Sequence, residues 1–269
     1  MTKKILFVGE GGQGIQTIAK TIAHAADSHY QHSSYIPSFG VEQRGTPSIA
    51  FVIVSDEEIH YPRFETADIL VILQPRGLNV VEQYIDKSTQ IIFDSSIMEP
   101  SLFAKYRSDI SAIPATAIAH HIGNPRVFNV VVTAVVARMI EIDRIETWKA
   151  IVLLLGSKLK DNSLLKQNED AYHSGWQFEL EKSKFSPADF QPETRNIIKK
   201  GYGKKAIIMP AKCKGCNICI SKCPVRALSS STTLNAFSTF IPEIDLEKCV
   251  ACGNCTQFCP DNAISVTKE

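Results

Sequence analysis

Two kinds of hydrophobic pattern alternate through the first 155 residues. Short runs rich in β-branched and other apolar residues predict strands at 4–8, 67–73, 89–94 and 109–114. Segment 15–26 instead places apolar residues three and four positions apart, as on one face of a helix. Further helices are expected over 126–140 and 145–156. This alternation predicts an α/β layered domain.

A further strand is expected at 47–55, after the turn-like "QRGTP". No helix separates it from 33–36, so it is expected to run antiparallel and to make the sheet mixed. A polar helix or turn region then ends the first domain, which we place at 1–181. Residues 182–205 are rich in Pro, Gly and Lys without a clear period, and they are interpreted as a linker. A cysteine-rich domain follows at 206–269.

Composition excludes several classes of partner. Apolar residues make up 44% and charged residues 21%, which is typical of a soluble globular protein. The net charge of +1 gives no reason to expect nucleic acid or an anionic membrane as a partner. The longest apolar stretches are too short or too interrupted to span a bilayer, and the first residues resemble a strand rather than a signal peptide. We therefore expect a cytoplasmic protein.

The cysteines carry the strongest chemical signal. All eight lie between positions 213 and 259, and they form the run C-x2-C-x2-C-x3-C-P twice without deviation. This is the spacing of bacterial two-cluster ferredoxins, so a small α+β domain with two [4Fe-4S] clusters is expected. Zinc knuckles are the alternative, but they use two separated pairs of ligands, whereas each run here has a third evenly spaced cysteine.

The spacing also predicts which cysteines share a cluster. Three thiolates on one tight loop reach three corners of a cubane, and the fourth cysteine, followed by Pro, reaches the other cluster. Segments 207–216 and 241–252 are expected to contribute equivalent strands, and 229–245 to form a hairpin between the halves. The expected ligand sets are Cys213, Cys216, Cys219 and Cys259 for one cluster, and Cys249, Cys252, Cys255 and Cys223 for the other.

A glycine-rich stretch, "VGEGGQG", lies between the first strand and the first helix. It has the G-x-G-x-x-G form of a dinucleotide fingerprint, but segment 28–41 lacks the acidic residue that would bind a ribose. Three interpretations remain: an NAD site, a contact with another phosphate-bearing ligand or a subunit, and a simple tight turn. The residues concerned are Gly11, Gly12, Gln13 and Gly14.

"GEGGQGIQTIAKTIAHAA" followed by "SYIPSFGVEQRGTPSIAFVIVSDEEI" resembles the gamma subunit of 2-oxoacid:ferredoxin (acceptor) oxidoreductases, the pyruvate synthase family. The match continues through "DILVILQP", "IIFDSS" and "GNPRVFNVVVTAVVARM" and covers about residues 3–180. "EQRGTP" departs modestly from the "RGG" common in that family. The cysteine-rich domain is similar to the family's delta subunit, so the chain resembles a fused gamma–delta subunit.

The resemblance implies an electron-transfer subunit without a complete active site. Thiamine diphosphate and Mg would lie on partner alpha- and beta-type subunits, which decarboxylate a 2-oxoacid and pass an acyl group to coenzyme A. Consistent with this, the sequence has no G-D-G followed by a suitably spaced Asn. Electrons would leave through the clusters to ferredoxin or another acceptor. Coenzyme A phosphates would contact the glycine-rich loop and Arg44, for which a solvated arginine or an intersubunit ion pair is the alternative.

Two other functions remain as alternatives. One is an NAD-linked ferredoxin reductase, which the missing acidic residue disfavours. The other is a non-catalytic electron-carrying adaptor. Neither the 2-oxoacid nor the final acceptor is specified by these residues.

Overall fold

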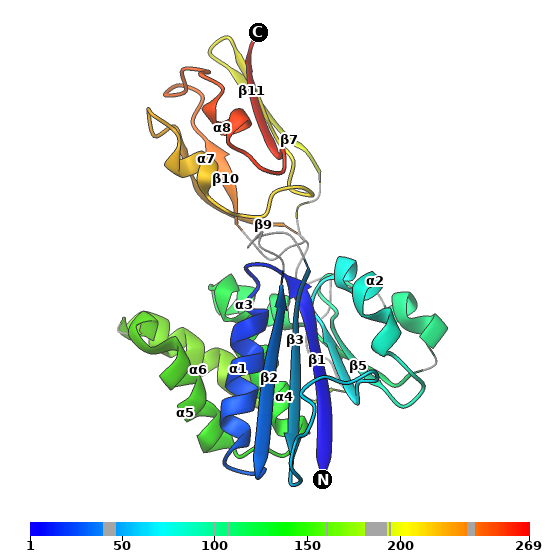
Figure 1. Cartoon of the computed structure of the whole chain (residues 1–269). Coiled ribbons are helices and arrows are strands. Elements are labelled where there is room, and N and C mark those ends of the chain that lie inside the picture. The colour runs from blue at the N-terminus through cyan, green and yellow to red at the C-terminus, as the bar shows by residue number, and fades with distance from the viewer. Residues whose placement is uncertain are drawn as a thin grey trace. The chain divides into compact units, whose positions relative to one another are not determined.

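The chain forms two compact units, Met1–Phe190 and Gln191–Glu269 (Figure 1). The computed structural model describes residues 1–39, 47–98, 100–106, 108–159, 161–180, 193, 195–235 and 240–269. Among these residues, no helix combines the length and apolar character needed to cross a membrane.

The N-terminal unit is built on a six-stranded sheet with the order β2-β3-β1-β4-β5-β6. Strand β3 pairs antiparallel with both β1 and β2, whereas β1, β4, β5 and β6 are parallel neighbours. The mixed sheet predicted from the sequence is therefore confirmed, and so is the antiparallel strand at 47–55. The strands are β1 (Thr2–Glu10), β2 (His32–Phe39), β3 (Pro47–Ser55), β4 (Ile69–Ile72), β5 (Gln90–Asp94) and β6 (Ile110–Ile113).

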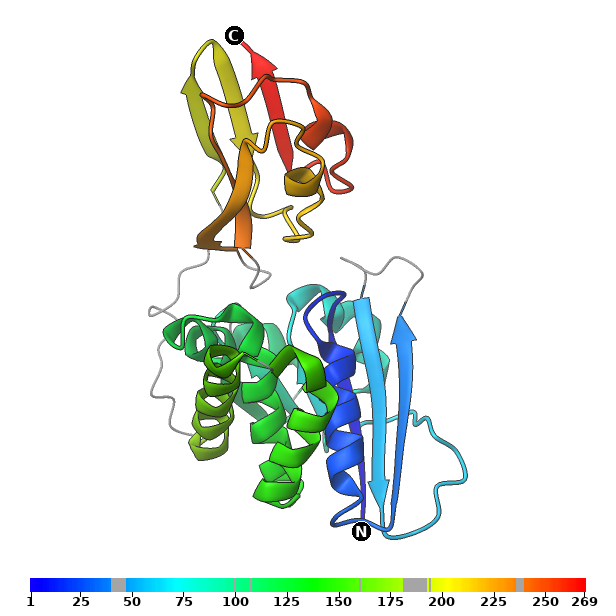
Figure 2. The ribbon, with the colours of Figure 1, turned by 90° about the vertical axis from the view of Figure 1, so that its left-hand side faces the viewer.

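Helices cover both faces of this sheet (Figures 1 and 2). Alternate residues of β1 point to opposite faces: Ile5 and Phe7 pack with the larger group of helices, and Leu6 and Val8 pack with the smaller group. Burial on both sides explains why Ile5–Val8 of β1 form an uninterrupted apolar run. The larger group contains α1 (Ile15–Ala26), α3 (Ala115–His121), α4 (Phe128–Met139), α5 (Arg144–Leu155) and α6 (Asn162–Gln177), and the smaller contains α2 (Leu78–Val81).

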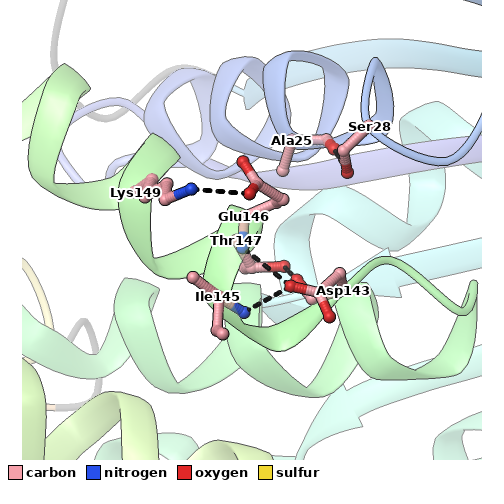
Figure 3. Close-up of polar contacts among 7 residues, drawn as sticks. All are labelled: Ala25, Ser28, Asp143, Ile145, Glu146, Thr147 and Lys149. Carbon is pink, nitrogen blue, oxygen red and sulfur yellow. Dashed lines mark hydrogen bonds and ion pairs between the residues drawn. The ribbon is translucent and has the colours of Figure 1, made fainter.

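The beginning of α5 shows how a helix of this unit is capped. Asp143 Oδ1 accepts hydrogen bonds from the backbone N–H groups of Ile145 and Glu146, at 2.7 and 3.1 Å (Figure 3). One carboxylate oxygen thus satisfies two N–H groups that have no partner within the helix. In the next turn, Glu146 pairs with Lys149 on the exposed side.

Helix α3 is capped from a different strand. Pro114 precedes it and makes no side-chain cap, and the carboxylate of Asp94, at the end of β5, takes over this function. Asp94 Oδ2 accepts from the backbone N and Oγ1 of Thr116, at 3.1 and 2.5 Å, while Oδ1 accepts from Ser96 N at 2.9 Å. Asp94 is 1% exposed. Burial raises the pKa of this carboxyl group, and these hydrogen bonds oppose the rise.

The C-terminal unit contains two small sheets, β11-β8-β7 and β10-β9. Strand β8 of the first half pairs with β11 of the second, and β10 of the second pairs with β9 of the first, so the two halves interlock. The expected hairpin over 229–245 corresponds to β9 and β10, and its residues 236–239 lie outside the described residues. The elements are β7 (Ile197–Gly201), β8 (Lys204–Ile208), α7 (Ile218–Ser221), β9 (Leu228–Leu234), β10 (Phe240–Ile244), α8 (Asn254–Gln257) and β11 (Ile264–Lys268).

One part of the expected linker is wrong. Residues 197–201, inside the stretch 182–205, form β7 and pair along their whole length with β8. Their Lys and Gly content concealed a strand because β7 is an edge strand with alternating half-buried and exposed positions, where lysine is common. Residues 181–192 and 194 lie outside the described residues.

Candidate functional sites: cysteine-lined cavities and a glycine-rich loop

Two cavities in the C-terminal unit are each lined by four cysteine side chains. Each cavity takes three cysteines from one run and the fourth from the other run. The cysteines of cavity 1 are Cys213, Cys216, Cys219 and Cys259. Those of cavity 2 are Cys249, Cys252, Cys255 and Cys223. The structure thus brings together the two sets that the spacing predicts.

The two cysteine loops repeat the same backbone conformation. Left-handed residues occur at three corresponding places in the two halves: Gly215 and Ala251, Asn217 and Gly253, Arg226 and Asn262. Four of these six residues carry a side chain, for which the left-handed region costs about 1–2 kcal/mol. The geometry is therefore imposed by the cysteine loop as a whole, and it opens α7 and α8 at equivalent points.

Backbone N–H groups point at cysteine sulfurs in the same repeated way. Ala227 N donates to Cys223 Sγ and Ala263 N donates to Cys259 Sγ, both at 3.2 Å. Ala251 N donates to Cys249 Sγ at 3.4 Å. Hydrogen bonds of this type stabilise negative charge on sulfur, and they influence the reduction potential of a cluster bound through it.

Burial disfavours the thiolate form of several of these cysteines. It raises the pKa of Cys213 and Cys255, and it raises the pKa of Cys219 to about 12. Negative charge on Cys216, Cys259 and Asp261 adds to the rise at Cys213. Cysteine ligands bind metal as thiolates, so iron binding at these sites must release protons.

The donor set fits two cubane iron–sulfur clusters. Each cavity offers four thiols, N–H groups directed at sulfur, and apolar walls such as Ile264 in cavity 1 and Leu228 in cavity 2. A zinc knuckle uses two separated pairs of ligands, whereas each run here supplies three evenly spaced cysteines to one cavity. When bound, a [4Fe-4S] cluster supplies one-electron transfer.

The glycine-rich loop lies where β1 ends and α1 begins, at the carboxyl edge of the parallel strands. Gly14 is left-handed, with φ 79°, and a Cβ there would come within 2.8 Å of Asn129 Nδ2. Gln13 is only 5% exposed. Its Oε1 accepts from Glu10 N at 2.7 Å, and its Nε2 donates to Leu73 O at 3.2 Å. Gln13 therefore ties the loop to Leu73, the residue that follows β4.

Two buried polar groups at this edge were not found from the sequence. Gln74, which follows β4, is 3% exposed, and its Nε2 has no hydrogen-bond partner. Ser95 follows β5 and its Oγ is likewise buried without a partner. Each lies within two residues of the end of a buried strand, and that position was the available signal. Arg44, the expected cationic partner of the loop, lies outside the described residues.

The fold and the two cavities define the class: a mixed α/β domain joined to a two-cluster iron–sulfur domain. A family model for pyruvate ferredoxin/flavodoxin oxidoreductase matches residues 4–178, and one for a 4Fe-4S dicluster domain matches 212–263. The chain thus belongs to the pyruvate ferredoxin/flavodoxin oxidoreductase family, as a gamma-type domain fused to a dicluster domain. The resemblance inferred from the sequence is confirmed.

Similar proteins match different shares of this chain and of their own length. A ketoisovalerate oxidoreductase subunit VorA of Methanothermobacter thermautotrophicus is 32% identical over 132 residues, which are 49% of this chain and 27% of that protein. The chain therefore spans about a quarter of that relative. The common gamma subunit of pyruvate/ketoisovalerate oxidoreductases of Thermococcus kodakarensis is 27% identical over 66% of this chain and 99% of its own.

A solved structure shares the fold. It is the 2-oxoglutarate:ferredoxin oxidoreductase of Magnetococcus marinus with 2-oxoglutarate, coenzyme A and succinyl-CoA bound. The TM-score is 0.60 at 21% identity, over 74% of this chain and 35% of that one.

Proposed function

We propose that this chain is the electron-transfer subunit of a multi-subunit, thiamine diphosphate-dependent 2-oxoacid:acceptor oxidoreductase. Alpha- and beta-type partners would hold thiamine diphosphate and Mg and carry out the oxidative decarboxylation. Two [4Fe-4S] clusters on this chain would carry the electrons to ferredoxin or another acceptor. The membership of the gamma-type family and the eight-cysteine domain support this proposal, while the relatives' names include more than one 2-oxoacid.

The observation that carries the proposal is the crossed lining of the two cavities. Each cavity takes its fourth cysteine from the other half of the repeat, and strands of the two halves pair with each other. Both sites therefore lie in one small folded unit. Two clusters in one such unit form a path for single electrons. The proposed ligands are the two cysteine sets given above.

We also propose that coenzyme A meets the gamma-type domain at the carboxyl edge of its sheet. The Gly11–Gly14 loop opens α1, and the end of that helix favours negative charge such as phosphate. Gln74 Nε2 is a buried donor without a partner at the same edge. Gln13, held by two backbone groups, would shape the loop, and Arg44 would supply the cation. The presence of coenzyme A in the 2-oxoglutarate enzyme, whose fold this chain shares, supports this proposal.

Anaerobic affinity purification from the native host tests the complex. The expected result is co-purification of two larger chains with bound thiamine diphosphate, and iron and sulfide equal to two cubane clusters on this chain. A panel of 2-oxoacids then identifies the substrate. Recovery of the chain alone, with iron and a nicotinamide nucleotide but no thiamine, would refute the proposal and favour an NAD-linked reductase.

Paired cysteine substitutions test the crossed ligand sets. Cys216→Ala with Cys259→Ala removes two ligands of cavity 1 and should cost one cluster, leaving about half of the iron. The matched pair, Cys216→Ala with Cys223→Ala, removes one ligand from each cavity and should disturb both clusters. Iron content and the EPR spectrum of the reduced chain are the measurements. The opposite pattern would show that each run of four cysteines binds its own cluster.

A further inference from the structure

The two cavities differ in charge at two corresponding positions of the repeat. In the first half, Lys214 follows the first cysteine, and in the second half Val250 occupies that place. After the Cys-Pro pair, the second half has Asp261, whereas the first half has Val225. Because the fourth cysteine crosses over, Lys214 and Asp261 both line cavity 1, and Val225 and Val250 both line cavity 2.

Lys214 and Asp261 form an ion pair. Lys214 Nζ lies 3.0 Å from Asp261 Oδ1, and the two side chains are only 14% and 23% exposed. By comparison, Lys248 and Asp245, just before the second cysteine run, are also 3.0 Å apart but are 66% and 43% exposed. Shielding from water strengthens the field of the first pair and weakens its screening by salt.

The residues at these corresponding positions are also less exposed at cavity 1 than at cavity 2. Asn235, at the end of β9, is fully buried, and its Nδ2 donates to the backbone oxygen of Cys213 at 2.5 Å. Pro242 of β10 lines the same cavity. At cavity 2, by contrast, Val250 is 53% exposed and Val225 is 37% exposed. The internal repeat therefore creates two cluster environments that are alike in backbone and different in charge and exposure.

We propose that the Lys214–Asp261 ion pair sets the reduction potential of the cluster in cavity 1 and makes the two clusters inequivalent. This inference rests on the proposed presence of both clusters. Reduction adds one negative charge to a cluster, so the Lys214 cation stabilises the reduced form and the Asp261 carboxylate destabilises it. Their balance fixes how easily this cluster accepts an electron, while cavity 2 has only apolar side chains at the same positions.

Redox titration of the full chain, followed by EPR, tests the sign of each contribution. Lys214→Met leaves the carboxylate unbalanced and should lower one midpoint potential, whereas Asp261→Asn leaves the cation and should raise the same one. We expect each change to be on the order of tenfold in the reduction equilibrium, which is about 59 mV for a one-electron couple. Lys214→Arg keeps the charge and should leave both potentials nearly unchanged.

The exposed pair next to the second run is the matched control. Lys248→Met and Asp245→Asn change the same charges at the same separation, and they should shift either potential much less because water screens them. If Lys214→Met fails to bind its cluster, Asp261→Asn still decides the question, because an unchanged or lowered potential in that variant would also overturn the inference. The inference would be overturned if Lys214→Met and Asp261→Asn shifted the midpoint potential in the same direction. It would also be overturned if the two control variants shifted it equally far. If the unaltered chain bound fewer than two clusters, that result would instead refute the proposed function.

Discussion

At the scale of single residues, an aspartate that caps a helix affects stability differently when it is exposed and when it is buried. Asp143 and Asp94 both cap a helix with one oxygen, but Asp143 is exposed to water, whereas Asp94 is buried and its second oxygen accepts from Ser96 N. An exposed cap is exchangeable among several residue types, because water satisfies what the side chain does not. A buried cap has no such alternative, and every donor that faces it needs a matching acceptor.

This difference predicts opposite outcomes for one substitution at two sites. Asp94→Asn places an NH₂ group against an N–H or O–H donor in either orientation, so it should destabilise the α/β unit by about 1–3 kcal/mol. Asp143→Asn keeps the one oxygen that caps α5, so it should change the stability by less than about 0.5 kcal/mol. Urea unfolding followed by tryptophan fluorescence measures both, because Trp148 and Trp176 lie in the N-terminal unit. Equal effects would contradict the proposed role of Asp94.

At the scale of elements, close approach of α4 and α6 organises the larger helical layer. Gly175 lies on the face of α6 that meets α4, where a Cβ atom would come within 2.4 Å of the backbone oxygen of Val131 and 2.9 Å of Ala134 Cβ. Neither a backbone oxygen nor a Cβ can rotate away. The two helices can therefore pack at this distance only if position 175 has no side chain.

Packing between α4 and α6 therefore decides whether Gly175→Ala stabilises or destabilises the N-terminal unit. In an exposed helix, this change would stabilise by about 1 kcal/mol, because alanine is the better helix former. Here the added methyl group must push α6 away from α4, and we expect a net loss of about 1–3 kcal/mol. Thermal unfolding by the same tryptophan signal measures it, with the half-buried neighbour Ser174→Ala as control. A gain in stability at Gly175 would show that the helices are not held at this separation.

At the scale of the whole chain, two units with different means of stabilisation are joined. The α/β unit has two extensive apolar clusters, one on each face of its sheet. The C-terminal unit has one small cluster, to which the cysteines of both cavities contribute. Domains of this size commonly need a metal or disulfides in addition to their apolar core. In this chain, the proposed clusters would therefore serve both the fold of their unit and its electron transfer.

Local patterns in the sequence were sufficient for several of the strands and helices and for the cysteine spacing. The strands at 47–55 and 89–94 and the helix at 15–26 were predicted correctly because each is a local periodicity backed by strong burial. Helix α3 was missed because its capping residue, Asp94, lies in strand β5 and not next to the helix in the sequence. Strand β7 was missed because an edge strand buries too little to leave a clear apolar pattern.

The amino-acid order also determined the cysteine spacing, and matching that spacing to the two-cluster pattern predicted which cysteines line each cavity. Pairing between distant residues was decided only by the tertiary structure. Gln13 is held by the backbone of Leu73, 60 positions away, and Lys214 meets Asp261 only because the two halves interlock. Such contacts depend on how the helices and strands pack. They join residues that are far apart in the sequence, so no periodic pattern in the sequence predicts them.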